Sequence, residues 1–362
     1  MHVVLIISSL SAGGAERVLS GLANHWAKRG HTVTILTLAP SDAIPFYPLD
    51  KKIKLEQLGL SEISRSLPHR LLNILKRILT LRKTIKTLSP DVVVSFISSM
   101  NITTLLATWG LTIPVVVSER THPLYHKLPP LDNLLRRLLY PKAAKIVVQT
   151  QSAADYFLPL DNIAVIPNSV RIPPILAQQQ EDVHHIISVG RLIPSKGFDS
   201  LIQAFGKIAH DFPKIHLTLY GEGEERRNLE KLVSELNLKD RIDLPGLVQD
   251  VQAKLAKADL FIFPSHYEGF PNALCEAMAA GLPIIASNCS GNIDVIQDGV
   301  NGRLFPVADI GKLTHLMREL IQDPAQRHRL SIEAQKITEH LAEDKIYQMW
   351  DDLICPLTAF AK

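Results

Sequence analysis

The chain has 362 residues, of which 46% are hydrophobic and 21% charged, with a net charge of +3 at pH 7. This composition is typical of a folded soluble protein and excludes a disordered chain, and the length favours two domains. The three cysteines lie far apart and form no metal-binding or disulfide pattern, so we expect a reduced, cytoplasmic protein. No apolar run reaches the roughly 18 residues that a membrane-spanning helix needs.

The charge is distributed unevenly along the chain. Up to Arg171 there are 20 Lys and Arg against 10 Asp and Glu, whereas the remainder has 19 against 26. A basic first half suits nucleic acid, acidic glycans or an anionic membrane surface. Its basic residues have no interleaved aromatic residues and no base-reading motif, so we expect no nucleic-acid partner.

Short runs rich in Val and Ile alternate with amphipathic helical patterns. Runs that are apolar on both faces predict parallel strands covered by helices on both sides, and therefore two doubly wound α/β domains. The expected strands lie at 2–7, 32–38, 91–97, 113–118 and 144–149 in the first half, and at 184–190, 214–221, 241–246, 259–265 and 283–288 in the second.

Three prolines and a polar run follow the first set of strands and predict a linker over 169–183. The domains would then span 1–168 and 184–335. Ligands of open α/β sheets bind beyond the carboxyl ends of the strands, so two such sheets facing one another would form a cleft. The segment 336–354 reads as one amphipathic helix.

A glycine pair, Gly13 and Gly14, stands between the first strand and a helix that begins near Ala15. Glycine lets a ligand approach the backbone, and a helix N-terminus favours an anion. The pair is equally explained as a tight turn chosen for its geometry alone.

The stretch "SVGRLIPSKGF" places Arg191 and Lys196 between a strand and a helix in the second half. Two cations over a helix N-terminus would hold a diphosphate, although solvated surface charges are the commoner fate of Lys and Arg. A later strand-end loop around Val248 suits recognition of a nucleotide base by backbone groups, or is a plain connection.

The stretch "SHYEGFPNALCEAM" carries two glutamates, Glu268 just past a buried strand and Glu276 in the helix that Pro271 and Gly281 delimit at 271–280. Both acids border the helix N-terminus. A carboxylate accepts hydrogen bonds from two sugar hydroxyls at once, so one acid could bind a ribose and the other a hexose, with phosphates at the helix end between them. The helix N-terminus would be exposed by Gly269, Phe270, Pro271, Asn272 and Ala273.

These residues resemble the motifs of glycosyltransferase family 4, the retaining nucleotide-sugar glycosyltransferases. Glu268 and Glu276 match its E-x7-E motif, "GRLIPSKG" looks like its phosphate loop and "GGAERV" like its N-terminal glycine loop. The stretches "GGAERVLSGLA" and "VVSERTHP" most resemble those of family members that build bacterial surface polysaccharides and lipid-linked oligosaccharides. The resemblance covers essentially the whole chain.

The resemblance implies a GT-B fold whose C-terminal domain holds the donor. Arg191 and Lys196 would then bind the diphosphate, Glu276 the ribose and Glu268 the transferred sugar. The donor side would be completed by Gly13, Gly14, Phe270, Asn272, Ala273 and Val248. Transfer would retain the anomeric configuration without a cofactor or a bound metal, in agreement with a sequence that has no Asp-x-Asp motif. The final segment, 336–362, would return to the first domain, or else simply cap the second.

The acceptor side departs from the family pattern. Many members carry a histidine just after the strand that matches "IPVVVS", where this chain has Ser118, Glu119 and Arg120, with His122 two residues later. Glu119 or His122 would orient the acceptor hydroxyl, although a structural role for His122 is the plainer explanation.

The segment 65–88 contains seven Lys and Arg and no acid, together with a leucine-rich face that includes Leu71, Leu75 and Ile78. Such a basic amphipathic helix can bind an anionic membrane or approach a lipid diphosphate, and it can also simply pack on the sheet. We expect a glycosyltransferase peripheral to the inner face of the cell membrane. It would move a hexose or N-acetylhexosamine from a nucleotide sugar, with UDP favoured, to a growing glycan or a polyprenyl-diphosphate-linked oligosaccharide. The alternative is a non-catalytic member that binds nucleotide sugar or glycan for an assembly.

Overall fold

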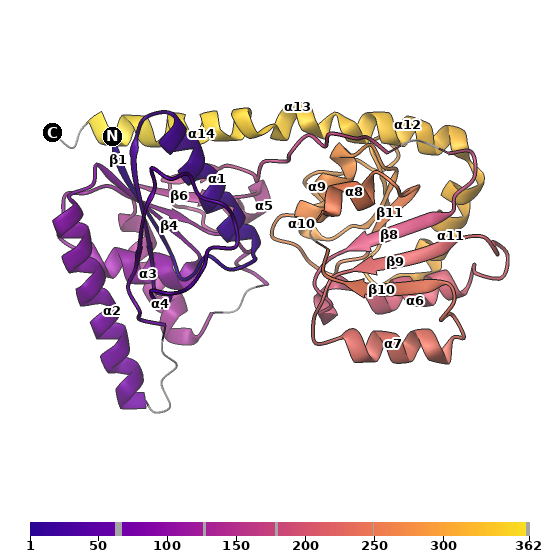
Figure 1. Ribbon diagram of the computed structural model, residues 1–362, viewed down its shortest axis with the longest axis horizontal. Helices are drawn as coiled ribbons and strands as arrows, with labels where there is room; N and C mark the ends of the chain where they lie inside the picture. The colour runs from indigo at the N-terminus through magenta and orange to yellow at the C-terminus, as the bar shows by residue number, and fades with distance from the viewer. Residues whose placement is uncertain (62–66, 126–127, 178–179, 249, 360–362) are drawn as a thin grey trace. The chain divides into compact units, whose positions relative to one another are not determined.

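The computed structural model describes residues 1–61, 67–125, 128–177, 180–248 and 250–359. The chain divides into two compact units (Figure 1). Unit 1 contains Met1–Asn168 together with Asp344–Lys362, and unit 2 contains Ser169–Glu343. Each unit is built on one parallel sheet, and we describe each by itself.

The sheet of unit 1 has seven strands in the order β3-β2-β1-β4-β5-β6-β7, and all neighbouring pairs are parallel. The central strands are buried on both faces because their side chains alternate between two helical layers. The strands are β1 (His2–Ile7), β2 (Thr32–Thr37), β3 (Lys54–Gln57), β4 (Val92–Phe96), β5 (Val115–Ser118), β6 (Lys145–Val148) and β7 (Ile163–Val165).

Helices cover both faces of this sheet. One layer is formed by three neighbouring helices in the order α2-α3-α4, whereas α1 pairs with the C-terminal helix α14, which lies beside it in Figure 1. The helices are α1 (Gly14–Lys28), α2 (Leu67–Leu88), α3 (Ser98–Ala107), α4 (Pro130–Leu139), α5 (Gln151–Asp155) and α14 (Glu343–Ala359), with a 3-10 turn η1 (Tyr140–Lys142).

The sheet of unit 2 has six parallel strands in the order β10-β9-β8-β11-β12-β13. The chain winds from β8 to β10 in one direction and from β11 to β13 in the other, so right-handed crossovers place their helices on opposite faces. The strands are β8 (His185–Val189), β9 (His216–Tyr220), β10 (Ile242–Gly246), β11 (Leu260–Phe263), β12 (Ile284–Ser287) and β13 (Arg303–Phe305).

The helical layers of unit 2 follow this winding. α6 packs with α7 and α11, whereas α9 packs with α12 and α13. The helices are α6 (Phe198–Gly206), α7 (Arg226–Glu235), α8 (Val251–Leu255), α9 (Asn272–Ala279), α10 (Ser290–Ile293), α11 (Ile310–Gln322), α12 (Pro324–Gln335) and α13 (Ile337–Leu341), with a 3-10 turn η2 (Pro194–Lys196).

The segment 336–354, expected to be one helix, is broken at Ala342, which has an extended backbone and a bridge to Val170. The part before the break, α13, belongs to unit 2, and the chain joins unit 1 only from Asp344. The expected return of 336–362 to the first domain therefore begins eight residues too early. Within unit 1, α14 places the buried Trp350 against Phe96 and Trp26.

The segment 169–183, expected to be a linker, is packed on unit 2 where it is described. The amide of Ala177 donates to the carbonyl of Ala280. The buried guanidinium of Arg327 donates to the carbonyls of Gln180 and Glu181. The backbone of this segment is therefore bound to unit 2, although Gln180 and Glu181 are exposed to solvent.

The apolar residues of α2 are distributed around the helix differently from the sequence prediction. Leu81 and Ile85 are buried and Ile78 is half-buried, whereas about half of the surface of Leu75 is exposed. The leucine-rich face is therefore split between the core and the surface. Arg65 lies outside the described residues, as do the side chains of Arg70 and Leu71. No helix in the described part of the chain is long and apolar enough to cross a bilayer.

Candidate functional site in unit 2

The winding of unit 2 reverses between the neighbouring strands β8 and β11. Loops that leave adjacent strands in opposite directions open a crevice at their carboxyl ends, which is where doubly wound sheets bind ligands. Here the two loops are in contact, because the amide of His266 donates to the carbonyl of Ser195 at 2.8 Å. Gly197 has a φ of +63°, and any side chain there would collide with the carbonyl of Pro264. Glycine is therefore required for the close approach.

An ion pair between Lys196 and Glu268 joins these loops. Lys196 Nζ lies 2.5 Å from Glu268 Oε1, and the side chains are only 16% and 9% exposed. The Ser265 hydroxyl donates to the same oxygen at 2.6 Å. Two donors on one oxygen hold the carboxylate in place and leave its Oε2 for a further hydrogen bond. The structure thus brings together two predicted residues that are 72 positions apart in the sequence.

Gly291, in the first turn of α10, lies close behind Glu268 and leaves room for it. A Cβ at this position would lie 2.7 Å from the Cβ and 2.9 Å from the carbonyl oxygen of Glu268. The Ser290 hydroxyl also reaches that carbonyl, at 3.5 Å. We did not identify Gly291, Ser290 or Ser265 from the sequence; only the three-residue spacing from Ser265 to Glu268 could have signalled one of them.

The helix α9 begins directly after this loop. Pro271 is its N-cap residue, the Cys275 amide donates to the Pro271 carbonyl at 3.0 Å, and Gly281 follows the helix end with a φ of +77°. The helix is two residues shorter than the expected 271–280. Glu276 lies half-buried in its second turn. Of the other predicted donor-side residues on this element, Phe270 is buried, and Asn272 and Ala273 are half-buried.

Arg191 is exposed and borders two cavities at the carboxyl edge of the sheet. The smaller, of about 120 Å³, is lined by Val248 and by Tyr220 from the end of β9. The larger, of about 620 Å³, extends over the η2 turn to His266. Burial raises the pKa of Tyr220, so this phenol stays protonated and can donate a hydrogen bond. Arg191 therefore lies between the smaller cavity and the loop that carries Lys196.

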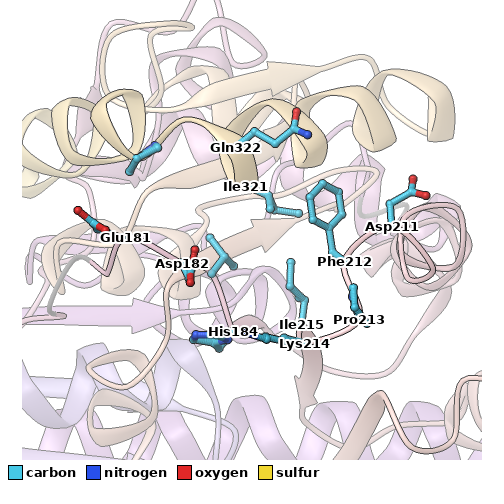
Figure 2. A pocket seen from close by; sticks show the side chains of 12 residues that line it. Glu181, Asp182, His184, Asp211, Phe212, Pro213, Lys214, Ile215, Ile321 and Gln322 are labelled. Carbon is cyan, nitrogen blue, oxygen red and sulfur yellow. The ribbon is translucent and has the colours of Figure 1, made fainter.

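Another groove of about 620 Å³ lies at the opposite, amino edge of this sheet. Its lining includes His184 before β8, Lys214 before β9 and Ile321 at the end of α11 (Figure 2). It contains no residue of the predicted site. Among the described residues, no group of three or more His, Cys, Asp or Glu side chains could hold a metal ion.

Gly13 and Gly14 lie in unit 1, where Gly13 is the N-cap of α1 in an extended conformation. The side chain of Glu16 folds back over Gly13, at the place where a Cβ would stand. The Ser11 hydroxyl donates to Glu16 at 3.4 Å. An acid from the chain itself therefore occupies the start of this helix, which favours the interpretation of the glycine pair as a turn in this conformation.

Glu119 follows β5 but points into the core of unit 1. It is 2% exposed and accepts hydrogen bonds from Ser98 Oγ at 2.7 Å and from the Tyr140 hydroxyl. Burial and the charge of Glu119 raise the pKa of Tyr140 well above its ordinary value, so the phenol remains a donor. These contacts favour a structural role for Glu119 over the expected role in orienting an acceptor hydroxyl.

His122 is also buried, at 4% exposure. Its Nδ1 accepts from the Leu124 amide at 3.3 Å, so Nε2 carries the proton and donates to Ser152 Oγ at 2.9 Å. Burial lowers the pKa of His122, which keeps the ring neutral at pH 7. Both ring nitrogens thus hold the loop after β5 in place, as in the plainer explanation.

Known proteins match this chain along nearly its full length. A family model described as "Glycosyltransferase Family 4" matches residues 12–172, and one described as "Glycosyl transferases group 1" matches residues 177–337. A Campylobacter jejuni relative is named GalNAc-alpha-(1->4)-GalNAc-alpha-(1->3)-diNAcBac-PP-undecaprenol alpha-1,4-N-acetyl-D-galactosaminyltransferase. It is 27% identical over 359 residues, covering 98% of both chains.

Two solved structures share the fold. Sucrose-phosphate synthase from Thermosynechococcus elongatus superposes with a TM-score of 0.85 at 19% identity, over 99% of both chains. HepE from Anabaena, in complex with UDP and glucose, superposes with a TM-score of 0.79 at 18% identity, over 98% of this chain and 99% of the other. The two family models meet close to the division between unit 1 and unit 2.

Proposed function

Because this chain belongs to glycosyltransferase family 4 and has the GT-B fold, we propose that it is a retaining glycosyltransferase with UDP as its nucleotide. It transfers a hexose or N-acetylhexosamine to a growing, lipid-linked glycan of the bacterial cell surface. The observation that carries this proposal is the ion pair of Lys196 and Glu268 at the reversal of the unit 2 sheet. The named Campylobacter relative supports the acceptor class, and the HepE complex supports UDP.

The proposed chemistry depends on charges that are fixed before the substrate arrives. Lys196 uses one of its three N–H donors on Glu268 and keeps the others for phosphate oxygens. Arg191, exposed beside it, adds a forked pair of donors to the diphosphate. Together they stabilise the charge that develops on the leaving diphosphate, so the reaction needs no bound metal.

The two glutamates have different tasks in this proposal. Glu268, next to Lys196, accepts hydrogen bonds from hydroxyls of the transferred sugar, and Glu276 on α9 accepts them from the ribose. The small cavity beside Val248 receives the base. The acceptor hydroxyl attacks from the face that the diphosphate leaves, which retains the configuration at the anomeric carbon.

Thermal unfolding with UDP, GDP and ADP tests the donor assignment. A ligand that binds only the folded protein stabilises it by about 2.7 kcal/mol at 100 times its Kd. We expect UDP to raise the melting temperature of the wild type, and we expect Glu276→Ala to lose this shift. Glu339→Ala, which removes an exposed acid from the same unit, is the control and should keep it. Equal shifts in both variants would contradict the role of Glu276.

A transfer assay separates the enzyme from a non-catalytic binding protein. UDP-sugar consumption by the wild type, in the presence of a lipid-linked glycan extract, should fall by at least about 100-fold in Lys196→Ala. A wild type that binds UDP but consumes no donor under any acceptor condition would favour the non-catalytic alternative.

We further propose that unit 1 binds an anionic membrane surface through α2 and α4. More than half of the surface of each of three α2 leucines is exposed, beside the exposed lysines. α4 repeats the pattern: Leu131, Leu134 and Leu138 form an exposed row beside Arg137. Leucines among cations suit the boundary between lipid headgroups and acyl chains. The exposed α2 residues are Leu72, Leu75 and Leu79, with Lys76, Lys83 and Lys86.

Sedimentation with lipid vesicles tests this surface. Replacing Lys76, Lys83 and Lys86 with Gln should weaken binding to phosphatidylglycerol vesicles by roughly 100-fold, since each cation near such a surface contributes about 1 kcal/mol. Arg77 and Arg82 are left in place because they donate to backbone carbonyls of unit 1.

The matched control replaces Lys239 and Lys254, two exposed lysines of unit 2, with Gln. The triple variant Leu131→Ser, Leu134→Ser and Leu138→Ser tests the α4 row separately. If none of these changes lowers vesicle binding relative to the control, the two helices are ordinary surface elements.

A further inference from the structure

Arg120 follows directly after β5, at the carboxyl edge of the unit 1 sheet. The winding of this sheet reverses between β1 and β4, and β5 is the next strand beside β4. Arg120 therefore lies one strand away from the place where a doubly wound sheet binds its ligand. The residue before the α3 helix, Ile97, has a φ of +75°, which is rare for a β-branched side chain and marks strained backbone at the same edge.

The guanidinium of Arg120 is surrounded by neutral groups. Nη1 donates to Ser118 Oγ at 3.3 Å and Nη2 donates to Asn168 Oδ1. The guanidinium carbon lies 5.6 Å from the centre of the Phe96 ring. Nε has no acceptor among the residues that the structure describes. Arginine has five N–H donors, so most of its hydrogen-bonding capacity is left over.

No carboxylate balances this charge within the described part of the chain. Glu119, its neighbour in sequence, faces the opposite way and binds Ser98 and Tyr140. Two other half-buried arginines differ from Arg120: Arg226 pairs with two glutamates, and Arg241 donates four hydrogen bonds to carbonyls. Burial lowers the pKa of Arg120 to about 9, so it remains charged at pH 7 at a cost in free energy.

We propose that Arg120 binds a phosphate group of the substrate, and we assign it to the diphosphate of the lipid-linked acceptor. This assignment rests on the function proposed above. Asn168 and Ser118 orient the guanidinium without neutralising it, so its charge is kept for an anion from outside the chain. The nucleotide also carries a diphosphate, so it is the other possible source of the phosphate group that Arg120 binds.

Isothermal titration calorimetry on the full chain distinguishes the sources, with farnesyl diphosphate and UDP as separate probes. Arg120→Gln should weaken binding of farnesyl diphosphate by roughly 10- to 100-fold, because a charge-assisted hydrogen bond is lost, and leave UDP binding unchanged. Arg120→Lys, which keeps the charge but loses the fork, should recover part of the affinity. Arg136→Gln removes another buried cation of unit 1 with neutral partners and is the control; it should bind both probes as the wild type does.

Each other result has a definite meaning. If Arg120→Gln loses UDP and keeps farnesyl diphosphate, Arg120 binds phosphate as proposed but the nucleotide supplies it. If Arg120→Gln binds both probes like the wild type, or if the wild type binds UDP and no farnesyl diphosphate, the proposal is overturned and the proposed function stands. A wild type that binds no UDP contradicts the proposed function instead, and the farnesyl diphosphate titrations still decide the role of Arg120.

The melting temperature of the ligand-free protein supplies a second readout. Removing an unbalanced, half-buried charge should leave the melting temperature of Arg120→Gln equal to or above that of the wild type. A fall of several degrees would assign Arg120 a structural role and overturn the proposal.

Discussion

Gly291 limits the space behind Glu268, and a larger residue there would displace the backbone that carries this carboxylate. In Gly291→Ala the new Cβ would lie 2.7 Å from the Glu268 Cβ, so the loop after β11 has to shift. We expect the transfer rate to fall by roughly 10- to 100-fold, because a displacement of about 1 Å misaligns the reacting groups. UDP affinity should change little, since Glu276 and Arg191 lie on other elements. Steady-state kinetics with UDP titration measures both.

Gly311→Ala is the matched control for this change. Gly311 is exposed near the start of α11, and a Cβ there makes only an ordinary contact with Asp309. This variant should keep its activity and gain stability slightly, since alanine favours a helix. Equal rates in the two variants would show that Gly291 does not position Glu268.

His122 gives unit 1 a dependence on pH with a defined sign. Its folded-state pKa is lowered by burial, whereas the unfolded chain titrates near the ordinary value of 6.5. Between these values the unfolded state binds more protons, so the free energy of unfolding falls as the pH drops below about 6.5. His122→Gln removes this titration and keeps an N–H donor for Ser152.

We therefore expect the wild type to lose stability more steeply than His122→Gln between about pH 7 and pH 5, by up to about 1.4 kcal/mol per pH unit. Urea unfolding across this range measures the difference. Parallel curves for the two proteins would mean that His122 is not titrated on unfolding.

The sequence identifies candidate residues of the site, but it does not show which of them are in contact. Lys196 and Glu268 are recognisable because each follows a buried strand, but their pairing depends on a loop contact that only Gly197 permits. Glu119 is a residue whose position in the sequence indicates a binding role that its contacts do not favour. Its place after β5 suggests a ligand, and only the positions of Ser98 and Tyr140 reveal that it points inward.

Apolar strands can be predicted from the sequence, whereas short strands at the edges of the sheets were missed. All ten strands expected from apolar runs are present in the structure. The three that were missed, β3, β7 and β13, are sheet edges of three or four residues. An edge strand has a neighbour on one side only and needs few apolar residues, as the polar β3 (Lys54–Gln57) shows. Tertiary pairing rather than local pattern forms these strands.

Asp351 joins the C-terminal helix α14 to α1. Its carboxylate accepts from Trp26 Nε1 at 2.7 Å, from Arg29 Nη1 at 2.7 Å and contacts His25 Nε2 at 3.1 Å. Asp351→Asn should lower the free energy of unfolding by about 2 kcal/mol, because hydrogen bonds to a charged, buried group are lost. Urea unfolding followed by tryptophan fluorescence reports the change directly.

Asp352→Asn is the matched control on the same helix. This carboxylate is exposed and accepts from Gln348 one turn earlier. Its replacement should cost less than about 0.5 kcal/mol. If both variants lose the same stability, the contacts of Asp351 do not fasten α14 to α1.

At the scale of the whole molecule, unit 2 is one continuous stretch and unit 1 is not. A large hydrophobic cluster of unit 2 lies between Val183 and Leu330, within this continuous stretch. We therefore expect a fragment of residues 169–343 to unfold cooperatively in urea. A fragment of residues 1–168 lacks Trp350, whose removal from a core typically costs about 3–5 kcal/mol, comparable with the stability of a small domain.

The fragment 1–168 should therefore unfold without a cooperative transition, and a peptide of residues 344–359 should restore that transition. Circular dichroism during urea titration distinguishes the two states. A fragment 1–168 that unfolds as sharply alone as with the peptide would show that α14 is dispensable for unit 1.

The divided unit also sets an order of events during translation. Residues 169–343 must be synthesised before α14 can reach α1 and β4, which takes about 10 to 35 s at roughly 5–20 residues per second. In that interval the N-terminal half has left the ribosome with Trp26 and Phe96 not yet covered by Trp350. Unit 2 needs no later segment, so it can complete its own core before α14 has been made. The first half to be made is therefore the last to be completed, and the nascent chain is most in need of a chaperone at its oldest part.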